Sequence, residues 1–264
     1  MNCLKTAEHI AAWLDSYAAG AGVDGFVVGV SGGVDSALSS TLAAMTGRPT
    51  LCATMPIHQA ASHVSRAEEH IAWLKGRFPR VGSVDINLTG VYENFLQGLP
   101  CAATDPVQQM ANANSRSRLR MTTLYYLAAL NNALVVGTGN KIEDYAIGFF
   151  TKYGDGGVDV SPIADLTKSE VYALASALGV CESIRSAPPT DGLFGDGRTD
   201  EQQIGATYAE LEWAMEQVDA GAQAEDFEGR QREVVAIYIR LNRANRHKMA
   251  PAPVCKIPDE LREL

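Results

Sequence analysis

The sequence lacks the signatures of several well-known protein classes. Its five cysteines form no C-x-x-C pair, which argues against a zinc or disulfide framework and favours reduced, mostly buried thiols. No apolar run approaches the length of a membrane span, and the N-terminus shows no signal-peptide pattern. Three histidines, His58, His63 and His70, lack the helical spacing of metal ligands. We therefore expect a soluble cytoplasmic protein that has no zinc site and does not insert into membranes.

Basic side chains are also scarce. The chain carries 22 Lys and Arg against 31 Asp and Glu, which gives a formal charge of −9. Such a chain repels a polyphosphate backbone, so tRNA and DNA are not expected partners. Two familiar nucleotide-binding patterns are missing as well. There is no G-x-x-x-x-G-K-[ST] loop and no G-x-G-x-x-G turn, which excludes a Walker-type site and a dinucleotide fingerprint.

One short run, FVVGVSGGVDSA over residues 26–37, carries the strongest functional signal. An apolar stretch typical of a strand passes through a glycine turn into a segment with helical spacing. Glycines allow the backbone to approach a phosphate, and the first N–H groups of a helix have no internal partner. The hydroxyls of Ser31 and Ser36 add donors, and Asp35 suits a Mg²⁺ ion placed between it and phosphate. The alternative is an ordinary strand-to-helix turn with a small-residue cap.

Strand and helix patterns alternate along the chain. The predicted strands cover residues 26–30, 50–55, 81–86 and 133–136. The predicted helices cover residues 3–18, 35–46, 91–96, 107–131 and 228–246, with another starting near Ser65 and two more capped by Thr167 and Thr199. This order predicts an α/β fold, a Rossmann-like parallel sheet with helices on both faces. Two glycine turns, 32–33 and 137–139, should then lie at the carboxyl ends of strands, where such sheets bind ligands. The Pro- and Gly-rich residues 185–200 read as a loop that could form a lid.

A second glycine-rich segment, GFFTKYGDGGVDVSP over residues 148–162, has the composition of a binding surface. Lys152 can neutralise a phosphate or a carboxylate, and Asp155 and Asp159 can accept hydrogen bonds from ribose hydroxyls or an amide. A flexible surface loop is the alternative, but paired phenylalanines are unusual in one.

Taken together, these segments resemble a known family. The run SGGVDS at 31–36 matches the loop of the ATP-pyrophosphatase superfamily, which includes the adenine nucleotide α-hydrolase-like fold. The whole ordered set is similar to the NH3-dependent NAD synthetases. The further matching runs are NSRSRLRM at 114–121, VVGTGNKIE at 135–143, GFFTKYGDGGVD at 148–159, LTK at 166–168, PPT at 188–190, TDE at 199–201 and HK at 247–248.

The resemblance implies a two-step ligase reaction. The nicotinate carboxylate of deamido-NAD attacks the α-phosphorus of ATP, pyrophosphate leaves, and ammonia then converts the acyl-adenylate into NAD and AMP. It also implies Mg²⁺, a homodimer with the helix 107–131 as the natural interface element, and one NAD synthase domain over residues 1–264. A fused glutaminase domain of the nitrilase type is not expected.

The resemblance also assigns roles by position. ATP contacts fall on Gly29, Val30, Ser31, Gly32, Gly33, Val34, Asp35, Ser36, Thr138, Lys168 and Thr190. Deamido-NAD contacts fall on Arg118, Lys152, Asp159, His247 and Lys248. Asp35 and Glu143 are the expected Mg²⁺ ligands, and Asp35, Glu143 and Lys168 are the expected catalytic residues. Taken singly, Glu143 could be a surface carboxylate, and His247 with Lys248 a basic helix end.

The chain departs from the family pattern at several positions. Met249 follows Lys248 where the usual run is H-K-R, Ser117 replaces an alanine, and Asp191 adds an acidic group. One more residue than in the commonest members separates Glu143 from Gly148, which makes Asp144 the fallback metal ligand.

Three other functions remain open on the sequence alone. A nicotinate mononucleotide-amidating variant would share the same reacting end. A tRNA-thiolating relative is disfavoured by the acidic charge and the missing C-x-x-C. A non-catalytic ATP-binding regulator is disfavoured by the presence of Asp35, Glu143 and Lys152.

Overall fold

The computed structural model describes residues 1–99, 106–190 and 199–262. The predicted lid over 185–200 therefore lies partly outside the described residues, and Asp191 lies wholly outside them. In the described part, no helix is both long and apolar enough to cross a bilayer. The four described cysteines are free, but only Cys52 is buried and Cys255 is exposed, so the expectation of mostly buried thiols is wrong.

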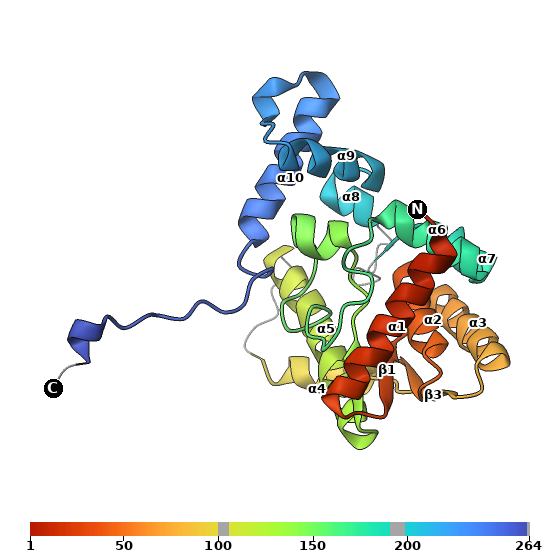
Figure 1. Ribbon diagram of the computed structural model, residues 1–264. Coiled ribbons are helices and arrows are strands. Elements are labelled where there is room, and N and C mark those ends of the chain that lie inside the picture. The colour runs from red at the N-terminus through yellow and green to blue at the C-terminus, as the bar shows by residue number, and fades with distance from the viewer. Residues whose placement is uncertain (100–105, 191–198, 263–264) are drawn as a thin grey trace.

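A four-stranded parallel sheet forms the centre of the fold (Figure 1). Its strands are β1 (Gly25–Gly29), β2 (Thr50–Thr54), β3 (Val81–Asp85) and β4 (Ala133–Val136). Their spatial order is β3-β2-β1-β4, and all neighbours pair in parallel. The predicted α/β class is confirmed. Because the strand order reverses between β1 and β4, the loops that follow these two strands diverge and open a crevice there.

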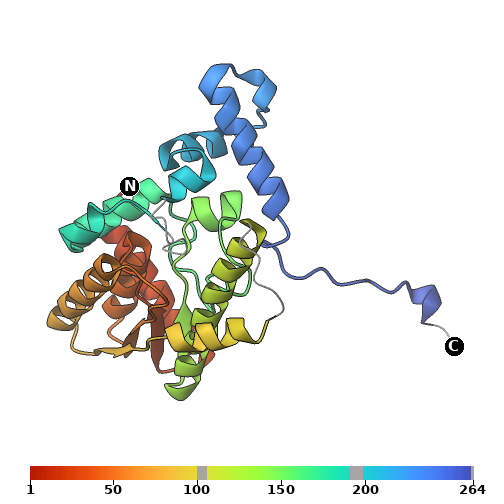
Figure 2. The ribbon, with the colours of Figure 1, turned by 180° about the vertical axis from the view of Figure 1, so that it is seen from behind.

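Helices cover both faces of the sheet (Figures 1 and 2). Alternation along β1 decides which helices each face receives, since successive side chains point to opposite sides. Phe26 and Val28 pack in a core with α1 and α2, whereas Val27 packs in a core with α5. The first face carries α1 (Cys3–Ala21), α2 (Val34–Met45), α3 (Ala61–Arg77), α6 (Lys168–Leu178) and the short α7 (Glu182–Arg185). The second face carries α4 (Thr89–Gln97) and α5 (Pro106–Leu130).

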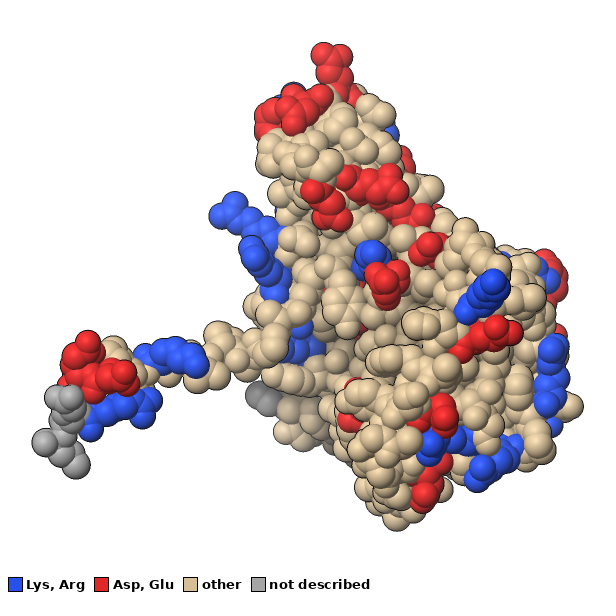
Figure 3. Space-filling view, viewed as in Figure 1, with Lys and Arg blue, Asp and Glu red and all other residues tan. Residues whose placement is uncertain are grey.

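A helical lobe stands beyond the carboxyl edge of the sheet, in the upper part of Figure 1. Its elements are the π-helix η1 (Lys141–Ile147), α8 (Asp200–Ile204), α9 (Tyr208–Asp219), the short η2 (Ala224–Asp226) and α10 (Gly229–Asn245). They share one apolar core, in which Ile142 and Ile147 of η1 pack against α9 and α10. Acidic side chains gather at the top of this lobe on the face shown in Figure 3. After α10, residues 250–262 extend away from the body as an arm that ends in η3 (Asp259–Leu261).

Helix boundaries test the sequence signals for caps. The capping boxes at Thr167 and Thr199 are confirmed, with both reciprocal bonds present. The predicted start near Ser65 is wrong, because α3 begins at Ala61 with Ala60 as its N-cap and no side-chain cap bond. Ser65 therefore lies inside a helix that neighbouring packing, rather than a local cap, stabilises.

His70 on α3 is fully buried against α2. Its Nε2 lies 2.9 Å from the hydroxyl of Ser40, which itself donates to the carbonyl of Ser36 at 2.7 Å. Nε2 therefore carries the proton and donates to Ser40, while Nδ1 has no partner. Burial lowers the pKa of His70 to about 4.

This burial predicts acid sensitivity. Below pH 6.5 the unfolded chain protonates His70, while the folded chain resists protonation down to about pH 4. The free energy of unfolding should therefore fall by about 3 kcal/mol as the pH decreases through that window. Urea unfolding between pH 7.5 and 4 should show a flatter dependence for His70→Leu. His9→Leu, at an exposed position of α1, should keep the wild-type slope; equal slopes for all three proteins would contradict the prediction.

Candidate active site

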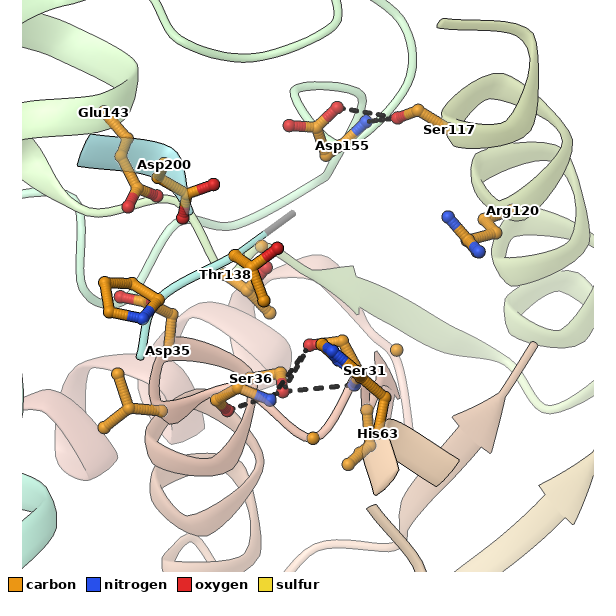
Figure 4. A pocket seen from close by; sticks show the side chains of 18 of the residues that line it. Ser31, Asp35, Ser36, His63, Ser117, Arg120, Thr138, Glu143, Asp155 and Asp200 are labelled. Carbon is orange, nitrogen blue, oxygen red and sulfur yellow. Dashed lines mark hydrogen bonds between the residues drawn. The ribbon is translucent and has the colours of Figure 1, made fainter. Parts of the chain in front are cut away.

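The turn after β1 is built as an anion-binding loop. Ser36 accepts a bond from the backbone N–H of Ser31 at 3.2 Å and donates to the carbonyl of Gly33 at 3.0 Å, and the two serine hydroxyls lie 3.1 Å apart. These bonds, drawn in Figure 4, hold the turn against the start of α2 at Val34. The free N–H groups of the first helical turn therefore face the crevice, where they favour negative charge.

Gly32 is the residue that this turn needs. Its φ is +86°, and a Cβ there would stand 2.5 Å from the carbonyl oxygen of His63. Arg66 on α3 donates to the carbonyl of Gly32 at 3.2 Å. The start of α3 thus supports the turn from behind at a distance that no larger residue permits.

Asn140 links the two loops that diverge from β1 and β4. Its Nδ2 donates to Asp35 at 3.0 Å, and its Oδ1 accepts from the N–H groups of Ile142 and Glu143 at 3.1 and 3.0 Å. Asn140 is fully buried and is the N-cap of η1. The side chain of Asn140 therefore fixes one oxygen of Asp35 and also the start of η1, the helix that carries Glu143.

Lys168 lies between the two acidic side chains. Its Nζ is 2.6 Å from Asp35 Oδ2 and 2.9 Å from Glu143 Oε1, and its side chain is only 3% exposed. Although burial opposes its charge, the two carboxylates raise the pKa of Lys168 above its ordinary value. Burial alone would raise the pKa of Glu143. The charge of Lys168 and the hydroxyl of Tyr208 outweigh that effect, so the pKa of Glu143 lies below its ordinary value. Charges buried in this way are tolerated only when each has a partner.

The carboxylate pair fits a hard divalent cation. Asp35 and Glu143 both point at the space that the Lys168 ammonium occupies, beside the anion-binding turn. Among the described residues, no group of three or more His, Cys, Asp or Glu side chains could hold a metal ion. Mg²⁺ usually takes only one or two carboxylates and completes its shell with phosphate and water, so two carboxylates beside a phosphate turn suffice.

A π-helix covers the stretch between Glu143 and Gly148 where the resemblance predicts one additional residue, and such winding is the usual way for a helix to accommodate one. The π-helix η1 runs over seven residues and ends at Gly148 in the left-handed conformation, where the N–H of Gly148 donates to the carbonyl of Glu143. Glu143 keeps its bond to Lys168, while the carboxylate of Asp144 packs against the backbone of Gly139. Burial and three neighbouring carboxylates raise the pKa of Asp144 well above its usual range. The geometry thus places Glu143, and not Asp144, beside Lys168 and Asp35.

The turn, the carboxylates and α5 enclose one cavity of about 260 Å³. Ser117, Arg120 and Asp155 line its far side, where Ser117 donates to Asp155 at 2.6 Å (Figure 4). Every residue expected to contact ATP lies in the cavity wall, and Glu143 lies there with them. The structure therefore brings the predicted ATP and metal residues together around one space.

The residues expected to contact deamido-NAD lie outside this wall. Arg118 donates to the carbonyl of Lys152 at 3.3 Å, and Lys152 donates to the carbonyl of His247 at 2.7 Å. Lys248 donates to the carbonyls of Gly148 and Phe150 at 2.6 and 2.7 Å. Asp159 accepts bonds from Tyr125 at 3.0 Å and from the backbone of Val135 at 2.8 Å. These contacts join the end of α10 to the glycine-rich loop beside the cavity.

Several residues of the site escaped the sequence analysis. They are Asn140, Asp200 and Tyr208 near the carboxylates and Arg120 on the far side of the cavity. On that side Asp155 is predicted as a hydrogen-bond acceptor, and Ser117 is identified only as a departure from the family pattern. Asn140 had a usable signal, because an asparagine after a glycine turn is a strong N-cap. Tyr208 had none of its own, since only the fold brings α9 to η1.

Comparisons with known proteins agree with this geometry. A family model described as NAD synthase matches residues 6–252. The NH(3)-dependent NAD(+) synthetase of Methanococcoides burtonii is 35% identical over 98% of this chain and 97% of its own length. The enzyme of the same name from Syntrophomonas wolfei is 36% identical over 99% of this chain and 100% of its own. Among solved structures, an NMN synthetase from Francisella tularensis is 31% identical and has a TM-score of 0.83, covering 97% of this chain and 100% of its own.

Removal of the buried ammonium should be costly. Lys168→Met leaves two buried carboxylates without a counter-charge, so the free energy of unfolding should fall by about 3–5 kcal/mol. Lys141→Met is the matched control, because Lys141 forms an exposed ion pair with Asp165 whose loss should cost about 1 kcal/mol or less. Urea unfolding at pH 7 measures both variants, and losses of equal size would rule out the bridging role of Lys168.

Proposed function

The chain belongs to the NAD synthase family, and we propose that it is an ammonia-dependent ligase that converts deamido-NAD into NAD. ATP and ammonia are the co-substrates, and AMP and pyrophosphate are the other products. The observation that carries the proposal is the gathering of Asp35, Glu143 and Lys168 beside an anion-binding turn in one cavity. We propose residues 1–264 as a single NAD synthase domain.

The chain's own groups suit an adenylation. The Ser31–Ser36 turn offers N–H and hydroxyl donors to the phosphates, with Thr138, Thr190 and the glycines of the turn in the same wall. Lys168 supplies a fixed positive charge where negative charge develops on the leaving pyrophosphate. Mg²⁺, held by Asp35 and Glu143, would add Lewis-acid stabilisation of the phosphates. No side-chain nucleophile is needed, because the substrate carboxylate is itself the attacking group.

The nicotinate end of the substrate has a second set of candidate partners. Arg118, Lys152, Asp159, His247 and Lys248 surround the glycine-rich loop beside the cavity, and we propose that they orient the dinucleotide. The curated relatives are named NAD synthetases, which favours deamido-NAD over the mononucleotide alternative. The acidic charge of the chain and the mixture of charges on the face in Figure 3 suit a small nucleotide better than a nucleic acid.

We propose that the working form is a homodimer. The exposed surface of α5 carries Val107, Tyr126 and Leu130, each at least 64% exposed, and Arg118 is exposed on the same helix. A second copy seated there would bury this apolar surface and approach the dinucleotide residues. The cytoplasmic location stays a prediction from the sequence.

Product analysis tests the reaction. The protein mixed with ATP, deamido-NAD and ammonium should release AMP and pyrophosphate in equal amounts. Asp35→Asn should lower kcat at least about 100-fold, since it removes a charged ligand of the proposed Mg²⁺ that would stabilise the reacting phosphates. Asp165→Asn, at a 98% exposed side chain, is the control and should keep wild-type activity.

Three outcomes would contradict the proposed reaction. Release of ADP and phosphate would exclude adenylation. Binding of ATP in calorimetry without any turnover would support the regulator alternative. A higher kcat/KM on nicotinate mononucleotide than on deamido-NAD would support the mononucleotide alternative.

Sedimentation velocity tests the dimer. Tyr126→Glu places a charge on the proposed interface and should raise the dimer dissociation constant at least about tenfold. Tyr17→Glu introduces the same charge at a 47% exposed tyrosine of α1 and should leave the dimer intact. A monomeric wild type, or an unchanged dissociation constant for Tyr126→Glu, would contradict this interface.

A further inference from the structure

Glu143 has a partner from a distant part of the chain. Tyr208, the first residue of α9, donates its hydroxyl to Glu143 Oε1, the same oxygen that accepts from Lys168. The phenol oxygen is 3.4 Å from Asp200, and Lys168 Nζ lies 4.7 Å from the centre of the Tyr208 ring. Tyr208 is buried and is not part of the cavity wall. It can therefore influence a bound substrate only through residues of the wall that it contacts, and its hydroxyl bond to Glu143 is the shorter of its two carboxylate contacts.

The lobe fixes Tyr208 before any ligand arrives. Its backbone N–H donates to Glu201 of α8 at 3.0 Å, and the capping box between Thr207 and Glu210 sets the start of α9. The ring belongs to the apolar core of the lobe, together with Ile142 from η1. The phenol therefore has few conformations to lose when it bonds to Glu143.

We infer that Tyr208 is a positioning residue that holds the Glu143 carboxylate in its metal-binding orientation and so sets the affinity of the site for divalent cation. This inference rests on the proposed function. A lysine shared between two carboxylates cannot orient either one once a cation and phosphates compete for the same charges. A neutral hydroxyl donor from outside the cavity keeps its bond to Glu143 throughout. Outer-shell donors to metal ligands typically affect metal affinity or activity 10- to 100-fold.

Tyr238 provides a matched control within the same core. It lies on α10, is 4% exposed, and packs in the cluster that contains Tyr208. Tyr208→Phe and Tyr238→Phe remove the same atom from equally buried rings. A general loosening of the lobe's apolar core would weaken Mn²⁺ binding in both variants, whereas the positioning role weakens it only in Tyr208→Phe.

The experiment measures Mn²⁺ binding, as a Mg²⁺ substitute, by electron paramagnetic resonance in the presence of a non-hydrolysable ATP analogue. Tyr208→Phe should bind Mn²⁺ about 10- to 100-fold more weakly than the wild type and lose a similar factor in kcat/KM for ATP. Its KM for ammonium should match that of Tyr238→Phe, which should bind Mn²⁺ as the wild type does.

Equal Mn²⁺ affinity in Tyr208→Phe and the wild type would overturn the inference, and so would an equal loss in Tyr238→Phe. Should Tyr208→Phe fail to fold, Glu201→Ala, which releases the Tyr208 amide outside the cavity, must weaken Mn²⁺ binding in the same direction or the inference fails. Failure of the proposed function is distinct, because it shows as an inactive wild type. A wild type that binds no Mn²⁺ overturns the inference and the metal assignment together.

Discussion

The buried ammonium of Lys168 is the interaction on which the rest of the site depends. Two carboxylates from different loops, Asp35 after β1 and Glu143 after β4, approach one another in a largely buried space, where they repel strongly unless a positive charge lies between them. Lys168, at the start of α6, supplies that charge. Across the crevice where the strand order reverses, the Lys168 ammonium thus joins the two loops through ion pairs, where other parts of the fold rely on apolar packing. A site held together in this way already has the charge balance that a metal-bound polyphosphate needs.

The elements around this triad divide the work of holding it. Asn140 fixes the loop from β4 to that from β1, and the capping box of α6 fixes the backbone from which Lys168 projects. Tyr208 adds a bond from the helical lobe, so the lobe is structurally continuous with the carboxylates and is not a mere appendage of the sheet. The hydroxyls of Ser31 and Ser36 hold the turn that follows β1. Each contact is short and polar, which suits a site that must bind charge with little rearrangement.

The sequence predicts those parts of the fold that local pattern decides. The apolar run before Ser31 predicts β1, glycine turns predict the carboxyl edge, and T-x-x-E spacing predicts the start of α6. The start of α3 is predicted wrongly, because packing against α2 extends that helix beyond its apparent cap. The bond from Tyr208 to Glu143 spans 65 positions and depends on how two lobes meet, so no short window contains it. Glu143 and Lys168 are predicted from the family resemblance, because the periodicity of the sequence gives no sign that these two residues form a pair.

The π-helix has a consequence for aligning this chain with its relatives. Forward counting from Asn140 reaches Glu143, the acidic side chain that meets Lys168. Backward counting from Gly148 by the spacing of the commonest members reaches Asp144, which faces the backbone of Gly139 instead. Between these two anchors lies a π-helix, the winding with which a helix typically accommodates one additional residue. An alignment that places its gap on the wrong side of Glu143 would therefore assign the proposed role of Glu143 to Asp144. The percentage identity of the alignment would not reveal the mistake.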